Sequence, residues 1–250
     1  VSLLFMEALN SEFNGQLTVG IQIFKNEYPK KFLHDLVSSQ LDMDRLDYLN
    51  RDSFYTGVLE GKIGAQRIIK MLDVHNDHLV IEEKGLYSIE KFIVARRLMY
   101  WQVYLHKTVL SAEKLLVKIL QRAKELADNK IELFSTPTLH FFLYNYISKN
   151  DFANSNKTID SFVQLDDFDI ISAIKVWQNH SDSVLSLLCK MLINRKLFKI
   201  EMQNNLFETD YISFLKTQSA SIIGIKADVI DYFVFTDVIS NNAYKPDYDK

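Results

Sequence analysis

The sequence predicts a mainly α-helical protein with a short β-hairpin and a small α+β segment near its C-terminus. Composition gives the first reason, because 48% of the 250 residues are hydrophobic and only 7 are glycine and 3 proline. The second reason is the run 88–128, which contains no glycine or proline and is the strongest helical signal in the chain. The third is a pair of short apolar runs around Asn76-Asp77, which is typical of a hairpin.

In the first part of the chain, helices are expected over residues 1–13, 28–38 and 44–58, and Gly57 and Gly61 should end the last of them. The apolar side chains of the first helix should face inward, namely Leu3, Leu4, Met6, Leu9 and Phe13. The hairpin strands are expected over 67–74 and 78–82. His75 and His78 flank its turn, but a metal site needs further ligands, so a plain turn is the better interpretation.

In the later part, the long helix should begin with Ser88 as its N-cap and bend near Lys107. Residues 147–160 are polar and predict a loop, and the acids of 165–169 predict a capped helix start rather than acid–base chemistry. The α+β appendix is expected from two strands with a helix between them, at 197–202, 208–218 and 230–235. The last residues, 243–250, carry no folding signal.

Charge and cysteine content narrow the functional classes. A formal net charge of -3 gives no electrostatic case for general nucleic-acid binding. The single cysteine, Cys189, lies in an apolar helical run, so it predicts a buried structural thiol in a reducing compartment, and we expect a cytoplasmic protein. No apolar run is long enough to cross a membrane, and no P-loop, Rossmann fingerprint or zinc-finger spacing is present.

The segment Asp42–Asp52 is the most informative part of the chain. It contains four carboxylates, two guanidinium groups and one phenol within eleven residues. On a helix, Asp44, Tyr48 and Asp52 share one face, with Arg45 beside it. That arrangement suits a metal-assisted phosphate site, in which a carboxylate holds a hard cation and an arginine holds a phosphate. The alternative is a solvated, salt-bridged helix surface.

This segment, D-M-D-R-L-D-Y-L-x-R-D, resembles the last conserved block of the HD-domain phosphohydrolases, in the branch that contains the dNTP triphosphohydrolases. The resemblance implies that Asp44 is a metal ligand and that Arg45 binds phosphate. It also implies that Tyr48 lines the sugar pocket and that Asp52 accepts a hydrogen bond from a ribose hydroxyl.

A second motif resembles the same family. Arg96, Tyr100, Tyr104 and Lys107 recur at spacings of four, four and three, and Arg96 to Lys107 resembles the family's R-x(7)-Y-x-H-K. The resemblance implies phosphate binding by Arg96 and Lys107 and packing of Tyr104 on the sugar. The alternative is an amphipathic helix surface with tyrosines at its edge.

The family's upstream His and His-Asp metal ligands have no counterpart here. His34-Asp35 stands only nine residues before Asp44, so it does not match the family motif, and His34 is expected to be an ordinary helix residue. We therefore expect a fragment whose catalytic residues and remaining ligands lie on preceding sequence. The resemblance implies a divalent metal ion (Mg, Mn, Fe, Ni or Zn) as cofactor.

The resemblance implies an HD-type helical bundle, with residues 1–146 as the C-terminal portion of the HD domain and 160–250 as a helical and α+β C-terminal lobe. The expected function is a metal-dependent phosphohydrolase that acts on nucleotides, in particular a deoxynucleoside triphosphate triphosphohydrolase. The alternative is a non-catalytic nucleotide-binding, regulatory or oligomerisation module. The expected partners are a nucleotide substrate and further copies of the chain, with no membrane and no nucleic acid.

Overall fold

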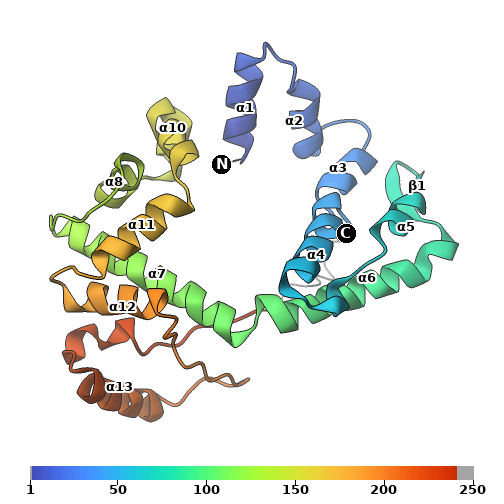
Figure 1. Cartoon of the computed structure of the whole chain (residues 1–250). Coiled ribbons are helices and arrows are strands. Elements are labelled where there is room, and N and C mark those ends of the chain that lie inside the picture. The colour runs from blue at the N-terminus through green and yellow to red at the C-terminus, as the bar shows by residue number, and fades with distance from the viewer. Residues whose placement is uncertain (1, 241–250) are drawn as a thin grey trace. The chain divides into compact units, whose positions relative to one another are not determined.

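The computed structural model describes residues 2–240, apart from the side chains of residues 153, 154 and 156. It is mainly helical with one small antiparallel sheet, which confirms the predicted fold class (Figure 1). The structure divides into two compact units. The first contains the chain up to His106 together with Ser240, and the second runs from Lys107 to Ile239. The predicted end of the C-terminal lobe, 241–250, lies outside the described residues. The predicted domain boundary between 146 and 160 stays a prediction.

The first unit has six α-helices, three shorter helical turns and the hairpin among the described residues. They are α1 (Ser2–Glu12), α2 (Thr18–Phe24), α3 (Phe32–Val37), α4 (Met43–Thr56), η1 (Leu59–Gly61), α5 (Ala65–Lys70), β1 (Leu72–His75), β2 (His78–Ile81), η2 (Glu83–Gly85), α6 (Leu86–Met99) and the π-helical turn η3 (Tyr100–Tyr104). The core of the unit joins α4, α5 and α6 through Leu46, Leu49, Ile63, Ile68, Phe92, Ala95 and Met99.

The predicted hairpin turn at Asn76-Asp77 is confirmed. Asn76 and Asp77 both have positive φ, 50° and 63°, as a two-residue turn that matches the strand twist requires. The Asp77 carboxylate also accepts a hydrogen bond from the backbone N–H of Lys31, at 2.8 Å, which ties the turn to the start of α3. His75 and His78 pair across the strands as part of this turn.

Three expectations for this unit are wrong in detail. Residues 65–70 form helix α5 rather than the start of a strand, because Ile68 is fully buried while Arg67 and Lys70 stay exposed. Helix α1 forms as predicted, but none of its residues is buried and Leu9 is 44% exposed. Helix α6 begins at Leu86 after Gly85 instead of at Ser88.

The long apolar run is interrupted between Met99 and Lys107, in agreement with the predicted bend. The interruption is the π-helical turn η3, in which the N–H of Leu105 donates to the carbonyl of Tyr100 at 2.8 Å. Such turns insert one extra residue into a helix and are frequent at functional sites. Here the turn carries Tyr100 and Tyr104 of the second motif.

The second unit is built on one long helix. Its elements are α7 (Lys107–Asp128), α8 (Pro137–Tyr144), α9 (Lys149–Asn154), α10 (Asn156–Gln164), α11 (Asp167–Trp177), α12 (Ser183–Ile193), α13 (Thr209–Ile223) and the 3-10 helix η4 (Ala227–Tyr232). Figure 1 shows α12 alongside α7, where Leu115, Ile119, Leu185 and Leu188 are buried in one core. Cys189 lies in that core, which confirms that its thiol is buried, and burial raises the pKa of the thiol to about 12.

Two expectations for this unit are wrong. Residues 147–160 contain helices α9 and α10, because Ser148 and Asp151 form a capping box that starts a helix. Residues 197–202 and 230–235 form no strand, since the first segment is irregular and the second begins inside η4 and continues as irregular chain after Tyr232. Ile230 and Phe233 are buried one helical turn apart, so their apolar side chains reach the core without a partner strand. The helix start at Asp166, with its capping box to Asp169, and the helix near 208–218 are both confirmed.

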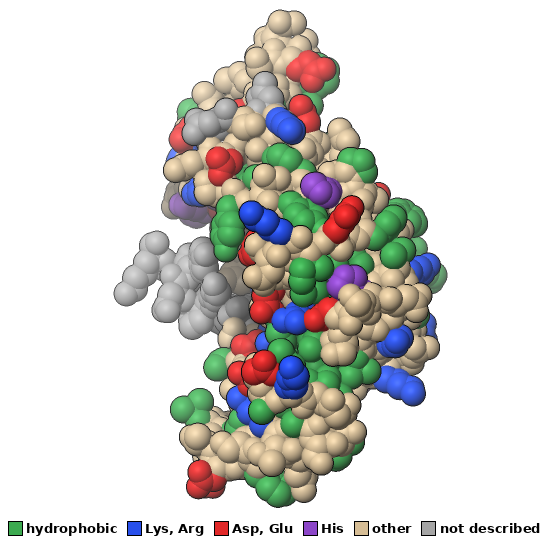
Figure 2. Space-filling view, turned by 90° about the vertical axis from the view of Figure 1, so that its left-hand side faces the viewer, with side chains coloured by type: hydrophobic (Ala, Val, Ile, Leu, Met, Phe, Trp, Pro, Cys, Tyr) green, Lys and Arg blue, Asp and Glu red, His purple; other side chains and the backbone are tan. Residues whose placement is uncertain are grey.

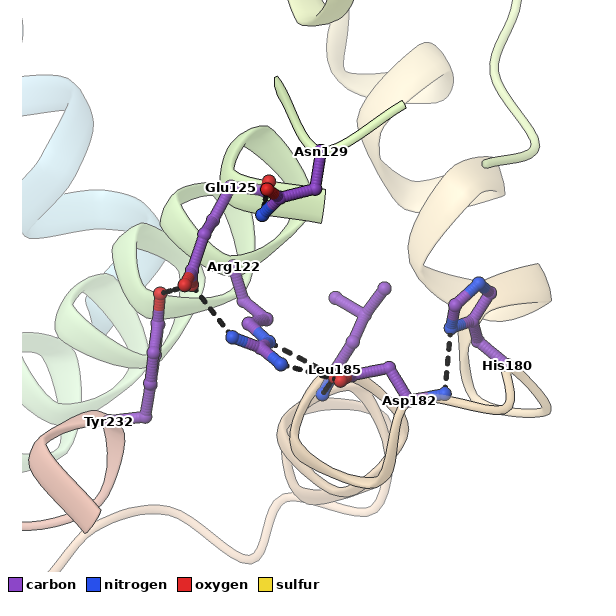
Figure 3. A network of polar contacts seen from close by, with 7 residues as sticks. All are labelled: Arg122, Glu125, Asn129, His180, Asp182, Leu185 and Tyr232. Atoms are coloured by element: carbon purple, nitrogen blue, oxygen red, sulfur yellow. Dashed lines mark hydrogen bonds and ion pairs between the residues drawn. The ribbon is translucent and has the colours of Figure 1, made fainter. Parts of the chain in front are cut away.

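A polar network joins three elements of this unit (Figure 3). The Arg122 guanidinium of α7 makes two hydrogen bonds to the Asp182 carboxylate, Nε–Oδ1 at 3.1 Å and Nη2–Oδ2 at 2.6 Å. Asp182 also caps α12 by accepting the backbone N–H of Leu185 at 2.8 Å. Glu125 receives hydrogen bonds from Arg122, at 2.7 Å, and from the Tyr232 hydroxyl of η4, at 2.6 Å. One arginine therefore holds α7, α12 and η4 together.

None of the helices in the described part of the chain is long and apolar enough to cross a membrane.

We predict that Asp182→Asn lowers the free energy of unfolding by about 2–3 kcal/mol at pH 7, because it leaves the largely buried Arg122 without its carboxylate. Burial would raise the pKa of Asp182, but its hydrogen bonds with Arg122 and Leu185 outweigh burial and hold that pKa below the usual range. The stabilisation is therefore complete above about pH 4, the ordinary pKa of an aspartate, and is lost as the pH falls further.

Urea unfolding at several pH values measures this effect, and wild type and Asp182→Asn should converge in acid. The matched control is Asp128→Asn, which breaks the more exposed Lys124–Asp128 pair on the same helix and should cost less than about 1 kcal/mol. Equal losses in the two variants would contradict the prediction.

Candidate functional site

Helix α4 starts at a buried carboxylate. Asp42 is the N-cap, is only 3% exposed and accepts the backbone N–H of Arg45 at 2.8 Å. The same carboxylate forms an ion pair with the Arg45 guanidinium, and the carbonyl of Ser39 accepts a further hydrogen bond from Arg45 Nη1 at 2.7 Å. The position of this guanidinium is therefore set from the first turn of the helix.

Three of the predicted residues lie along one face of α4. Asp44 is exposed, while Tyr48 and Asp52 are half-buried. The Tyr104 hydroxyl donates to Asp52 Oδ2 at 2.7 Å, and the rings of Tyr48 and Tyr104 meet edge to face with centroids 6.1 Å apart. The Tyr100 ring packs on Tyr104 in the same way, at 5.3 Å. Helix α4 and the π-helical turn thus form a tyrosine cluster around one carboxylate.

The second arginine of the site is deeply buried. Arg96 of α6 is 6% exposed, and its Nη1 donates to Gln40 Oε1 at 3.1 Å. The Nε–H groups of Arg96 and Arg45 are both buried without a hydrogen-bond partner in the described structure. A buried donor without an acceptor costs about 1–3 kcal/mol, so these two arginines are the incompletely satisfied polar groups of the site.

Both guanidinium groups act on the tyrosine cluster. Burial raises the pKa of Tyr48, while the charges of Arg96 and Arg45 oppose that rise. Burial also raises the pKa of Tyr104, and its hydrogen bond to Asp52 adds to the effect because a phenolate there would face a carboxylate. Both phenols are therefore neutral hydrogen-bonding groups at physiological pH.

Six predicted residues are thus linked through Tyr48 and Tyr104 in the first unit, and their functional roles stay predictions. They are Asp44, Arg45, Tyr48, Asp52, Arg96 and Tyr104. Lys107 is exposed and begins the second unit, so its proposed phosphate contact also stays a prediction. The alternative of a solvated helix surface holds for part of the segment, since Asp47 and Arg51 form an exposed ion pair at 2.9 Å.

The sequence predictions assign no role to Asp42, Gln40 or Tyr100. An aspartate just before a helix is a common N-cap, which is the signal for Asp42. Tyr100 stands midway between Arg96 and Tyr104 at helical spacing. Gln40 has no such signal, because its contact with Arg96 spans 56 residues.

No complete metal site lies within the residues that the structure describes. Asp44 offers an exposed carboxylate, but no three His, Cys, Asp or Glu side chains converge to hold an ion anywhere in residues 2–240. His34 Nδ1 lies 2.9 Å from the carbonyl of Ile23, as expected of an ordinary helix residue. The described residues therefore do not form a complete metal site by themselves.

This chain is similar to several known proteins. The family described as the HD associated region matches residues 63–136. A crystal structure of a phosphohydrolase from Bacteroides thetaiotaomicron is 58% identical, with a TM-score of 0.90, over 92% of this chain and 57% of that one. The protein YwfO of Bacillus subtilis is 38% identical over 178 residues, 71% of this chain and 39% of its own length.

The name of a more distant relative includes a substrate. The deoxynucleoside triphosphate triphosphohydrolase SAMHD1 homolog of Dictyostelium discoideum is 27% identical over 99 residues, 38% of this chain and 19% of that protein. The chain spans about two fifths of YwfO and just under three fifths of the Bacteroides protein. Residues 63–136 match the HD associated region, and 92% of this chain is similar to the Bacteroides phosphohydrolase. Together these two findings show that this chain belongs to the HD phosphohydrolase superfamily.

Proposed function

We propose that this chain supplies the phosphate- and sugar-binding part of a metal-dependent phosphohydrolase that acts on nucleotides, with deoxynucleoside triphosphates as its substrates. One observation carries the proposal. Two guanidinium groups, Arg45 and Arg96, each keep a buried N–H without an acceptor beside a cluster of tyrosines. The named activities of the Bacteroides and Dictyostelium proteins support the same reaction class.

The arginines would neutralise the phosphate chain. The Arg45 side chain keeps 29% of its surface exposed, so its guanidinium can be reached by an anion although Nη1 is already held by Asp42 and Ser39. Arg96 lies deeper and adds positive charge in a desolvated position, where electrostatic interactions are stronger than in water. Guanidinium groups bind phosphate oxygens in pairs and stabilise the charge of a phosphoryl-transfer transition state.

The tyrosine cluster would hold the sugar. Tyr104 uses Asp52 Oδ2, which leaves Oδ1 of that carboxylate to accept a hydrogen bond from a ribose hydroxyl. The rings of Tyr48 and Tyr104 offer an apolar edge for the sugar ring. A tyrosine packed against a sugar leaves little room for a 2′-hydroxyl, and this favours deoxynucleotides.

Asp44 would contribute one ligand to a divalent cation. Its carboxylate is exposed on the same face of α4 as Tyr48, and the other ligands would come from outside the described residues. When bound, such an ion activates water and polarises a phosphoryl oxygen. This chain would contribute a carboxylate, Asp44, beside the arginines that bind phosphate.

A second candidate function is a nucleotide-binding or regulatory module without hydrolysis. The lack of a convergent set of three metal ligands within residues 2–240 favours it for this chain taken alone. Turnover by a protein that joins this chain to the additional length of its relatives would support the enzyme. Binding without turnover in that protein would support the module.

A homo-oligomer is also part of the proposal. Figure 2 shows apolar side chains lying open among charged ones on the face that it presents. In the second unit, Leu206 and Ile222 are 90% and 83% exposed. Apolar surface of this kind often marks an interface between copies.

We predict that Arg96→Lys weakens binding of a non-hydrolysable deoxynucleoside triphosphate analogue by about 10- to 100-fold, because lysine cannot reproduce the planar fork of arginine. Isothermal titration calorimetry on this chain measures the affinity. Arg97→Lys is the matched control, since Arg97 is the exposed neighbour on the same helix and should leave binding unchanged. Wild-type affinity in Arg96→Lys would remove Arg96 from the phosphate site.

We predict that Asp44→Asn abolishes metal retention and lowers turnover by about 100-fold or more in a protein that includes the further length of the relatives, because a neutral amide binds a hard cation poorly. Elemental analysis of the purified protein measures metal content, and phosphate release measures turnover. Asp47→Asn is the control, as Asp47 lies on the exposed side of α4 in a surface ion pair. Unchanged metal content in Asp44→Asn would exclude Asp44 as a ligand.

A further inference from the structure

The short segment between α3 and α4 contacts both arginines of the site. The carbonyl of Ser39 and the carboxylate of Asp42 bind the Arg45 guanidinium, and the side-chain carbonyl of Gln40 binds that of Arg96. Arg45 and Arg96 belong to different helices, α4 and α6, so this segment joins two groups that are far apart in the sequence.

We infer that residues 39–42 act as a brace that sets the relative position of the two arginines before a polyphosphate binds, with Gln40 and Asp42 as positioning residues. This inference rests on the proposed function and adds the device that organises its phosphate site. An arginine side chain loses about 2 kcal/mol of conformational entropy when it is fixed in place. A brace that fixes both side chains in the free protein removes that cost from the binding step.

Asp42 couples Arg45 to the helix that carries the rest of the site. One buried carboxylate accepts both the backbone N–H and the guanidinium of Arg45, so the side chain moves only with the first turn of α4.

Gln40 holds Arg96 differently. Its amide is neutral, so it orients the guanidinium through a hydrogen bond at 3.1 Å without cancelling its charge. The arginine that is only 6% exposed thus keeps its full positive charge toward an anion, while the more exposed Arg45 is paired with a carboxylate. A glutamate in place of Gln40 would bind Arg96 more strongly but would repel phosphate. Stability and anion binding should therefore change in opposite directions when Gln40 is replaced by glutamate.

Two substitutions of Gln40 therefore test the charge and the brace separately. Gln40→Glu keeps a hydrogen bond to Arg96, so it should keep or raise the thermal stability of the chain and weaken binding of inorganic triphosphate by on the order of tenfold, through the added negative charge beside Arg96. Gln40→Met removes the hydrogen bond without adding charge and should also weaken binding. If Gln40 only stabilised the fold, Gln40→Met would bind triphosphate as the wild type does.

Calorimetric titration with inorganic triphosphate, and separately with a deoxynucleoside that lacks phosphate, measures the two halves of the site. Ser38→Ala is the matched control, because Ser38 is exposed, lies just before the brace at the end of α3 and donates its backbone N–H to the carbonyl of His34. Loss of triphosphate affinity in both Gln40 variants, with deoxynucleoside binding unchanged and Ser38→Ala binding triphosphate as the wild type does, would support the brace. Wild-type triphosphate affinity in Gln40→Met would overturn the brace alone, whereas no triphosphate binding by the wild type would overturn the brace and the proposed phosphate site together.

Discussion

The candidate site depends on one buried carboxylate. Asp42 is 3% exposed, and a charge in that position is stable only when it is paired and hydrogen-bonded. Its partners are the first turn of α4 and the guanidinium of Arg45, so the same interaction starts the helix and orients the arginine. Asp44, Tyr48 and Asp52 follow on this helix, and their common face is therefore set from its first residue.

The rest of the site comes from α6 and the π-helical turn that follows it. Phe92, Ala95 and Met99 anchor α6 in the core of the first unit, and Arg96 lies among them with a guanidinium held by Gln40. Tyr104 is the last residue of this turn, and its hydroxyl donates a hydrogen bond to Asp52 on α4. The regular α-helical hydrogen-bonding pattern is therefore interrupted at the point where the tyrosine cluster forms.

The second unit has its own core and its own polar anchor. Arg122 joins α7 to α12 through Asp182 and to η4 through Glu125 and Tyr232. Burial raises the pKa of Tyr232 to about 12, and its hydrogen bond to Glu125 contributes. These contacts stabilise the unit without any of the residues predicted for the nucleotide site, so stability and binding can be altered separately in this chain.

Local sequence patterns predicted most of the longer helices, the Asn76-Asp77 turn, the helix start at Asp166, the end of α4 at Gly57 and the stripe on α4, because hydrogen bonds and side-chain spacing within a few residues decide them. Local patterns were ambiguous where a short apolar run fits either a helix or a strand, as at residues 65–70 and 230–235. There, burial of Ile68 and of Ile230 against distant residues decided the outcome. Only the tertiary structure brought Gln40 to Arg96 and Asp52 to Tyr104, because contacts across more than fifty residues depend on how α4 and α6 pack and leave no periodic trace in the chain.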